Sequence, residues 1–245
     1  NTRLVGSEMC IRDRKLKKVS NKVNILESID ISITSDTIFG LLGPNGAGKT
    51  SLFSILAGLS KPSEGEVLYD SKIVNNLSFE KRSELGVIYL PQEPSVFREL
   101  TVEENIKAAL EAKKIEKKEI DYKFTRISEE FDLMSIKTQK CNSLSGGQRR
   151  RVEIARAIAL NPKLILLDEP FAGIDPLIIN EIKTLIKNLK EKGIGVLISD
   201  HNVNATLDIC DYIYVINAGK VIAQGIPNEI VQNEIVRKVY LGEVT

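Results

Sequence analysis

Residues 43–50 of the chain, Gly-Pro-Asn-Gly-Ala-Gly-Lys-Thr, combine the residue types that hold phosphate groups. They fit the pattern G-x-x-x-x-G-K-[ST], whose glycines let backbone N–H groups converge on phosphate oxygens without interference from Cβ atoms. Lys49 can reach the β- and γ-phosphates of a nucleotide as a point charge, and the Thr50 hydroxyl suits Mg²⁺, which prefers oxygen ligands. The pattern therefore predicts a phosphate site formed by Gly43, Pro44, Asn45, Gly46, Ala47, Gly48, Lys49, Thr50 and Ser51.

Apolar residues on both sides place this loop between a strand and a helix. Residues 37–42 predict a buried strand, and Leu52, Phe53, Leu56 and Leu59 recur at helical spacing. A helix that begins at the loop adds about half a positive charge behind the phosphates. A glycine-rich turn with an exposed lysine is the alternative, but the strand and helix around the loop favour the phosphate site.

Two carboxylates follow a second apolar run. Residues 164–167 lead directly into Asp168 and Glu169, which predicts that both acids lie at the carboxyl end of a buried strand, where α/β sheets bind ligands. Asp168 is suited to hold Mg²⁺, directly or through water, and Glu169 to accept a proton from the water that attacks the γ-phosphate. The alternative is an acidic helix cap before Pro170.

Gln92 and His201 each follow a predicted strand at the same edge of the sheet. Residues 86–91 predict a strand that leaves Gln92 at its exit, and His201 follows Ile198-Ser199-Asp200. A lone histidine is more often a packed or surface residue, but its place at a strand exit favours a role beside the phosphate. We therefore expect Glu169, His201 and Gln92 to act on water, Mg²⁺ and the γ-phosphate.

Composition limits the protein class. The 245 residues, 42% of them hydrophobic, suit one sizeable α/β domain or a main domain with a lobe. The 34 basic and 33 acidic residues give no basic excess, so no nucleic-acid partner is expected. The apolar runs are too short to span a membrane, no signal-peptide pattern opens the chain, and Cys10, Cys141 and Cys210 are scattered beside a single histidine. These features predict a soluble cytoplasmic protein without a structural metal.

The order of apolar segments predicts a mostly parallel sheet covered on both faces. Residues 100–160 interrupt the alternation of strands and helices and predict a helical lobe, which opens with a capping box at residues 101–104. Residues 212–217 and 220–224 predict a hairpin around Ala218-Gly219. Residues 1–14 match no expected element and look like a translated cloning or sequencing adapter, so we expect a non-native extension at 1–14 and the domain at 15–245.

A further motif, Leu-Ser-Gly-Gly-Gln at residues 144–148, makes the chain similar to the nucleotide-binding subunits of ABC transporters from about residue 16 to its end. This resemblance implies a P-loop NTPase of the ABC type, an α/β fold with a mostly parallel core sheet, a small antiparallel β part and a helical lobe. It implies ATP and Mg²⁺ as cofactors. It assigns Gln92 to the Q-loop, Asp168 to the Walker B aspartate, Glu169 to the catalytic base, Asp175 to the nucleotide-binding D-loop and His201 to the switch histidine. The metal ligands would be Thr50, Gln92 and Asp168.

The same resemblance implies a dimer. Ser145 and Gly147, together with Gly146 and Gln148, would contact the γ-phosphate of a nucleotide that a second subunit holds. The chain carries only one of each motif, so two copies must pack head to tail around two ATP molecules.

Residues 89–100, 167–176, 200–203 and 239–243 are similar to the lipopolysaccharide-export ATPases of Gram-negative bacteria. This similarity implies a peripheral ATPase on the cytoplasmic face of the inner membrane that is coupled to two transmembrane permease subunits. These would dock near Gln92, Phe97 and Arg98, where an ordinary loop with a packed Phe and a solvated Arg is the alternative. Alternative functions are the ATPase of a branched-chain amino-acid importer and a non-transport ABC protein.

The chain departs from the family pattern ahead of the phosphate loop. ABC ATPases usually place an aromatic ring there to stack on adenine, and the aligned residue is Ser20; residues 1–38 contain no Phe, Tyr or Trp. Losing a stacking ring removes roughly 1 kcal/mol of binding free energy, so we expect weaker and less base-selective nucleotide binding. The usual glycine before the strand is Asp36.

Overall fold

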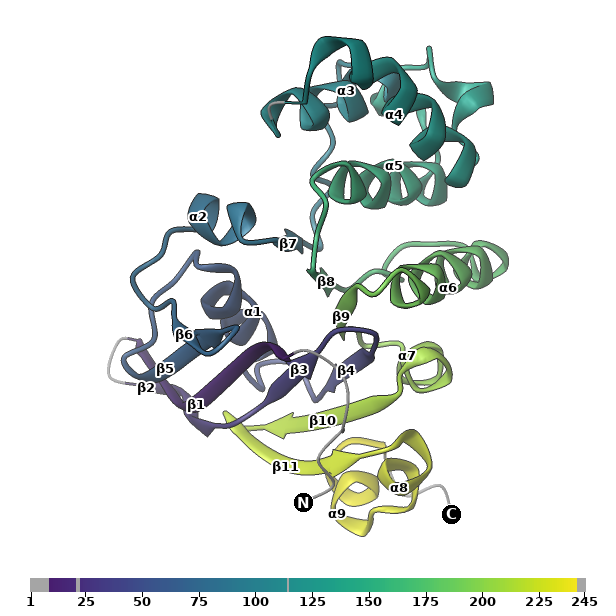
Figure 1. Ribbon diagram of the computed structural model, residues 1–245. Coiled ribbons are helices and arrows are strands. Elements are labelled where there is room, and N and C mark those ends of the chain that lie inside the picture. The colour runs from purple at the N-terminus through teal and green to yellow at the C-terminus, as the bar shows by residue number, and fades with distance from the viewer. Residues whose placement is uncertain (1–8, 21–22, 114, 242–245) are drawn as a thin grey trace.

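A six-stranded sheet forms the centre of the protein. The computed structural model describes residues 9–20, 23–113 and 115–241 (Figure 1). The strands follow the order β11-β10-β4-β9-β8-β7; all neighbours are parallel except β11, which is antiparallel to β10. Their bounds are Lys220–Gly225 (β11), Tyr212–Asn217 (β10), Ile38–Leu42 (β4), Gly195–Ser199 (β9), Leu164–Asp168 (β8) and Val87–Leu90 (β7). The expected mostly parallel sheet is thereby confirmed.

Strand β8 shows why such strands read as unbroken apolar runs. Leu164 and Leu166 face one core cluster, together with α1 (Lys49–Ala57), whereas Ile165 and Leu167 face the other, together with α6 (Pro176–Glu191). Because both faces are covered, all five residues of the strand are buried. The apolar run therefore continues until Asp168 reaches the edge of the sheet.

The small antiparallel part is also confirmed. Its strands are β1 (Met9–Ser20), β2 (Val23–Ile29), β3 (Ser32–Thr34), β5 (Glu64–Tyr69) and β6 (Lys72–Ile73), in the order β2-β1-β5-β6 with β3 on β1. Residues 9–14, which we expect from the sequence to lie outside the fold, instead form the first half of β1 and pair with β3 and β5. Ile11 is buried there because alternate side chains of a strand face the core. The pairing itself uses backbone groups, so it leaves no motif in the sequence.

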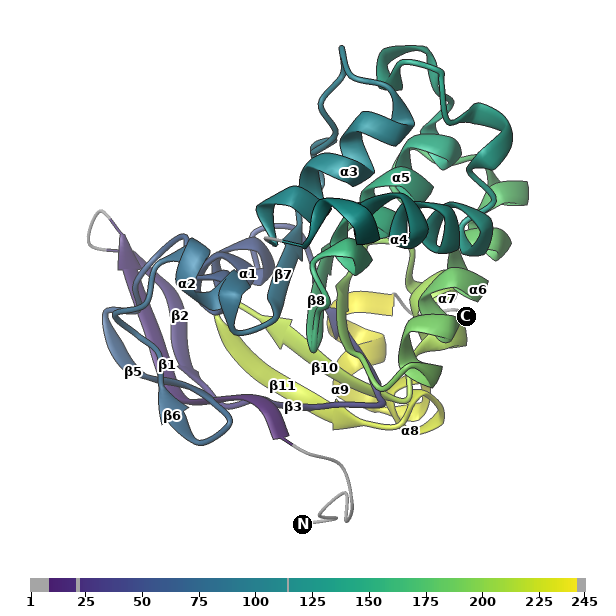
Figure 2. The same cartoon turned by 45° about the horizontal axis from the view of Figure 1, so that its top comes forward.

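Three helices, α3 (Val102–Ala112), α4 (Lys117–Glu130) and α5 (Gly146–Ala159), stand beyond β7 and β8 as a lobe (Figure 2). Two 3-10 turns, Met134–Ile136 and Cys141–Ser143, connect α4 to α5. The remaining helices are α2 (Phe79–Glu84), α7 (Val203–Ile209), α8 (Pro227–Gln232) and α9 (Glu234–Val236), and a π-helical turn covers Arg237–Leu241. Of the helices in the described part of the chain, none has both the length and the apolar character that crossing a membrane requires.

Helix α1 is held at its end by an unusual buried cation. The helix stops at Ala57, so Leu59, which the spacing predicts on its inner face, lies beyond the turn and is exposed. The guanidinium of Arg82, on α2, donates to Ile55 O (2.6 Å) and Leu56 O (2.8 Å). Ile55 O also accepts from Gly58 N just past the helix (3.1 Å), so Arg82 adds side-chain bonds to the last carbonyls of α1, the helix whose other end begins at Lys49.

Candidate functional site

The phosphate loop connects β4 to α1, as the motif predicts. Gly48 has φ = 106°, and a Cβ atom there would lie 2.6 Å from Leu26 Cδ2. A side chain at this position would therefore be strained and would collide with β2. The sequence pattern and the geometry both require glycine immediately before Lys49.

Lys49 points into its own loop. Its Nζ atom donates to Gly43 O (2.7 Å) and Pro44 O (3.0 Å), and its side chain is buried. Burial lowers the pKa of Lys49, and the charges of Glu169 and Asp168 raise it in part. The ammonium group is thus enclosed by the loop and lies within electrostatic reach of both carboxylates.

Asp168 ends β8 as a buried carboxylate. The Tyr89 hydroxyl donates to Asp168 Oδ2 over 3.2 Å. Burial raises the pKa of Asp168, whereas the Tyr89 hydrogen bond and the Lys49 charge lower it. No sequence motif singles out Tyr89; its only signal is its place in the strand that pairs with β8.

The structure brings Glu169 and His201 together. The carboxylate Oε2 of Glu169 lies 3.3 Å from His201 Nδ1, and the His201 side chain is 62% exposed. The backbone of Glu169 has φ = 48°, and its N–H donates to Ser199 O over 2.6 Å. Glu169 thus turns away from the direction of β8 and reaches the exit of β9.

A fully buried aspartate, Asp200, fixes these two strand exits relative to each other. Its Oδ2 accepts a hydrogen bond from Phe171 N (2.9 Å) and its Oδ1 from Asn202 N (2.7 Å). Burial raises its pKa, and the two backbone hydrogen bonds lower it. The sequence motifs do not predict this role for Asp200; its position directly before His201 at a strand exit is the one signal for it.

Gln92 is exposed just beyond β7. It lines a cleft together with Glu169 and with Gly146, at the start of α5. Asp175 lies at the start of α6, where its Oδ1 accepts from Leu177 N over 2.8 Å and caps the helix. Gln92 and Glu169 therefore share one surface, and Asp175 positions the helix beside it.

The Leu-Ser-Gly-Gly-Gln turn, residues 144–148, starts α5. Ser145 Oγ accepts from Gln148 N (3.2 Å), and Gln148 Oε1 accepts from Ser145 N (3.0 Å), so the two residues form a capping box. Ser145 and Gly146 are exposed, which leaves the N-terminus of a 14-residue helix open to an anion. Among the described residues, no hydrogen bond or ion pair joins residues 144–148 to the phosphate loop at 43–50.

The residues that the sequence predicts as magnesium ligands are of types that suit this ion. Thr50, Gln92 and Asp168 offer a hydroxyl, an amide oxygen and a carboxylate, the oxygen ligands that Mg²⁺ prefers. Because burial raises the pKa of Asp168, a cation beside it would stabilise its ionised form. Lys49 and the loop lie on the same side and supply the positive charge that phosphates need.

Comparison with known proteins agrees with this geometry. The ABC transporter family profile matches residues 26–172, and the profile of the branched-chain amino acid ATP-binding cassette transporter matches residues 220–244. The chain is 46% identical over 229 residues to the lipopolysaccharide export system ATP-binding protein LptB of Haemophilus influenzae, covering 93% of this chain and 95% of that protein.

Solved structures agree as well. One similar structure is the ADP conformation of MJ1267, an ATP-binding cassette of an ABC transporter, with a TM-score of 0.87 and 30% identity over 96% of this chain and 99% of that one. Another is the dimeric post-hydrolysis state of the ATP-binding cassette MJ0796 bound to ADP and Pi, with a TM-score of 0.78 and 27% identity over 89% of this chain and 98% of that one.

The two glycines of the turn at the start of α5 lead to a matched prediction. A Cβ atom on Gly147 would lie 2.4 Å from Ile178 Cγ2, whereas one on Gly146 would find only Gly173 O, at 3.5 Å. We expect Gly147→Ala to lower the free energy of unfolding by about 1–3 kcal/mol because it overpacks the contact of α5 with α6. Gly146→Ala should be neutral or stabilise by up to about 1 kcal/mol. Urea denaturation checks both; equal midpoints for the two variants would contradict the packing described.

Proposed function

Because the chain belongs to the ABC transporter family of ATP-binding subunits, we propose that it hydrolyses ATP to power the export of lipopolysaccharide from the inner membrane. The observation that carries this proposal is the similarity to LptB over nearly the whole length of both chains. We propose that the protein works as a peripheral subunit on the cytoplasmic face of that membrane.

In this proposal, Glu169 accepts the proton of the water that attacks the γ-phosphate. The contact between Glu169 Oε2 and His201 Nδ1 supports this role, because it orients the carboxylate and leaves the second ring nitrogen of His201 free for the phosphate. Lys49 balances the phosphate charge, and Thr50, Gln92 and Asp168 hold Mg²⁺. The metal ion, when bound, neutralises charge that develops on the phosphate oxygens.

The site is completed by a second copy of the chain. Ser145 and Gly146 are exposed at the N-terminus of α5, and Gly147 is buried behind them. Among the described residues, this turn makes no hydrogen bond or ion pair with the phosphate loop of the same chain. A two-fold dimer that packs head to tail brings this turn to the nucleotide of the partner. The dimeric form of the similar cassette MJ0796 supports such an arrangement.

Two permease subunits dock on the loop between Gln92 and α3. Phe97 is 51% exposed and Arg98 is also exposed, which supports a contact surface beside the catalytic cleft.

Ser20, which stands where the family usually has an adenine-stacking aromatic residue, ends β1, and we expect its lack of a ring to weaken nucleotide binding. Asp36 adopts φ = 56° in the turn before β4, a conformation that glycine adopts more freely.

A second candidate function is the ATPase of a branched-chain amino-acid importer. The match of residues 220–244 to that family favours it. Depletion of the protein in cells separates the two functions, because each predicts a different cargo defect. We expect lipopolysaccharide to accumulate in the inner membrane while branched-chain amino-acid uptake stays normal; the reverse pattern would favour the importer.

The role of Glu169 is tested by Glu169→Gln. The amide cannot accept the proton of water, so ATP hydrolysis should slow by about 10²–10⁴-fold, while the ATP dissociation constant changes little. Phosphate release measures the first quantity and nucleotide titration the second. Glu191→Gln, at the exposed end of α6, is the control and should keep the wild-type rate. An unchanged rate in Glu169→Gln would remove Glu169 from the role of base.

A further inference from the structure

The segment at 95–101, which we call the docking loop, is held by two side chains of α5. The N–H of Ser95 donates to Glu153 Oε1 (2.7 Å), and its carbonyl oxygen accepts from the guanidinium of Arg156 (2.6 Å). Both hydrogen bonds involve a charged group, so they are stronger than bonds between neutral groups. The backbone at Ser95 is therefore fixed to α5 from both sides.

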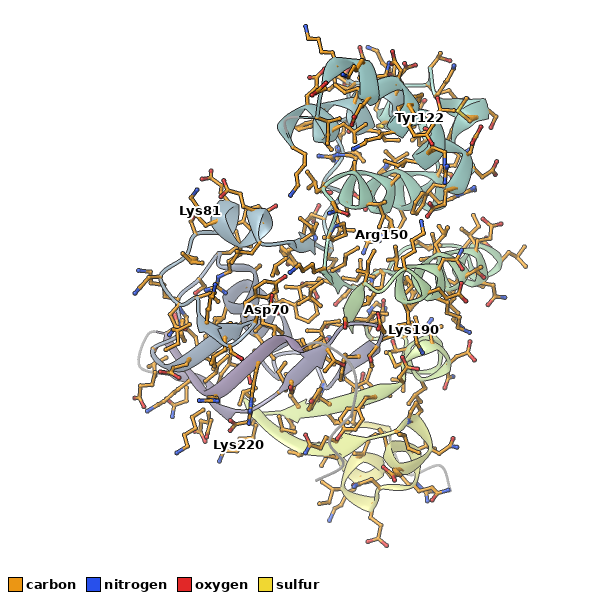
Figure 3. All side chains as sticks on the ribbon, in the orientation of Figure 1. Asp70, Lys81, Tyr122, Arg150, Lys190 and Lys220 are labelled. Atoms are coloured by element: carbon orange, nitrogen blue, oxygen red, sulfur yellow. The ribbon has the colours of Figure 1, made fainter. Side chains whose placement is uncertain are left out.

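Glu153 is committed to this contact. It is 3% exposed, and its second carboxylate oxygen accepts from Arg150 over 2.9 Å. Arg150 lies on α5 where the helical lobe meets the rest of the molecule (Figure 3). With both oxygens bonded inside the protein, the carboxylate is anchored as the acceptor for Ser95.

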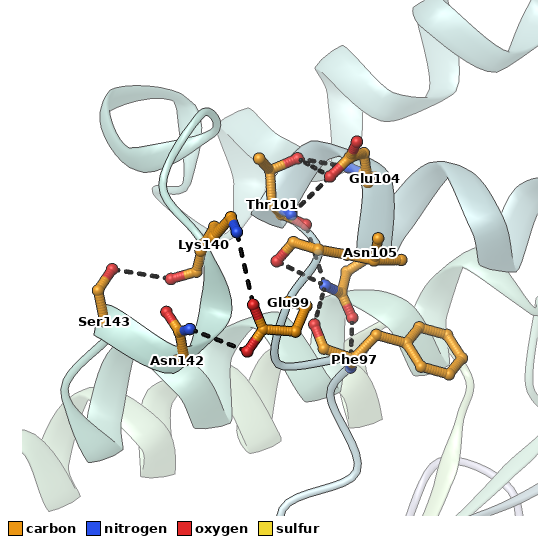
Figure 4. A network of polar contacts seen from close by, with 9 residues as sticks. Phe97, Glu99, Thr101, Glu104, Asn105, Lys140, Asn142 and Ser143 are labelled. Carbon is orange, nitrogen blue, oxygen red and sulfur yellow. Dashed lines mark hydrogen bonds and ion pairs between the residues drawn. The ribbon is translucent and has the colours of Figure 1, made fainter.

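A buried amide on α3 holds the next part of the docking loop (Figure 4). Asn105, fully buried, accepts from Phe97 N (2.9 Å) and donates to Phe97 O (3.0 Å) and Thr101 O (2.9 Å). Glu99 accepts from Asn142 over 3.2 Å at the other side of the loop. The docking loop is thus bonded to α3, to α5 and to the 3-10 turn that precedes α5.

Arg156 also contacts the exposed ring of Phe97 in the docking loop. Its guanidinium carbon lies 4.7 Å from the ring centre of Phe97, within range of a cation–π contact. One face of the ring therefore rests on Arg156, and 51% of the residue stays open to a partner. A partner that displaces Phe97 therefore acts directly on Arg156.

The connection to the central sheet is weaker. Strand β7 ends at Leu90, and within the described chain residues 91–94 form no hydrogen bond with another residue. The docking loop therefore has several polar bonds to the helical lobe, whereas residues 91–94, which join it to β7, add none.

We propose that Glu153, Arg156 and Asn105 are positioning residues that make the docking loop and the turn at 144–148 one mechanical unit. The two lie on the same lobe, and α5 links them: it begins at the turn and carries Glu153 and Arg156 nearer its other end. A permease segment on Phe97 then moves Ser145 and Gly147 together with the loop. This inference rests on the proposed docking of permeases at Phe97.

The first test measures hydrogen exchange in the chain alone. Arg156→Lys keeps the charge but loses the planar contact with Phe97, and Glu153→Gln loses the charged acceptor for Ser95. Amide exchange at 95–100 should rise about tenfold in each variant, with strand β8 unchanged. Arg151→Lys is the matched control, because Arg151 lies on the same helix but pairs with Asp132 and Glu181, away from the docking loop. Its exchange should equal that of the wild type.

The second test measures how strongly the permeases stimulate ATP hydrolysis. We define the stimulation as the ATP hydrolysis rate of the copurified complex divided by the rate of the chain alone. This stimulation should fall about fivefold in Arg156→Lys, while the KM for ATP stays unchanged, because the lost contacts transmit force and do not bind nucleotide. Unchanged exchange, or raised exchange with unchanged stimulation, would overturn the proposal. If Phe97→Ala leaves assembly of the complex intact, the docking surface itself is misplaced; the exchange result is independent of that outcome.

Discussion

The carboxyl ends of four adjacent parallel strands meet at one edge of the sheet, and the site depends on that convergence. Strand β4 delivers the phosphate loop with Lys49, β8 delivers Asp168 and Glu169, β9 leads to Asp200 and His201, and β7 leads to Gln92. These residues are far apart in the sequence. The strand order β4-β9-β8-β7 places their side chains beside one another, so that a buried cation and three buried or half-buried carboxylates share one field.

Charge explains why this edge is suited to phosphate chemistry. Burial favours the neutral forms of Lys49 and Asp168. The negative charge of Asp168 raises the pKa of Lys49, and the positive charge of Lys49 lowers the pKa of Asp168, so each residue favours the ionised form of the other. A nucleotide with its metal ion supplies further charges of both signs. The ionised forms of the groups at this sheet edge are therefore stabilised further when the ligand is bound. The buried Asp200 holds the exits of β8 and β9 in place through its two backbone hydrogen bonds.

Much of the sequence-based prediction depended on local patterns. The unbroken apolar run of β8 predicts a strand with both faces covered, and the glycine pattern before Lys49 predicts the loop, because each signal is contained in consecutive residues. Contacts between distant segments leave no such signal. The Tyr89 bond to Asp168 depends on the register of β7 and β8, and the support of Phe97 by Arg156 depends on how the lobe folds back. The sequence gives no motif for the strand at residues 9–14 for the same reason, since strand pairing uses the backbone.

The central claim is that one nucleotide site needs the loop of one copy and the turn at 144–148 of another. The most direct measurement mixes two inactive variants, Lys49→Ala and Ser145→Arg, in equal amounts and follows ATP hydrolysis. Half of the dimers are then mixed, and each mixed dimer has one intact site, so the account predicts about a quarter of the wild-type rate. A rate no higher than the mean of the two separate variants would contradict it.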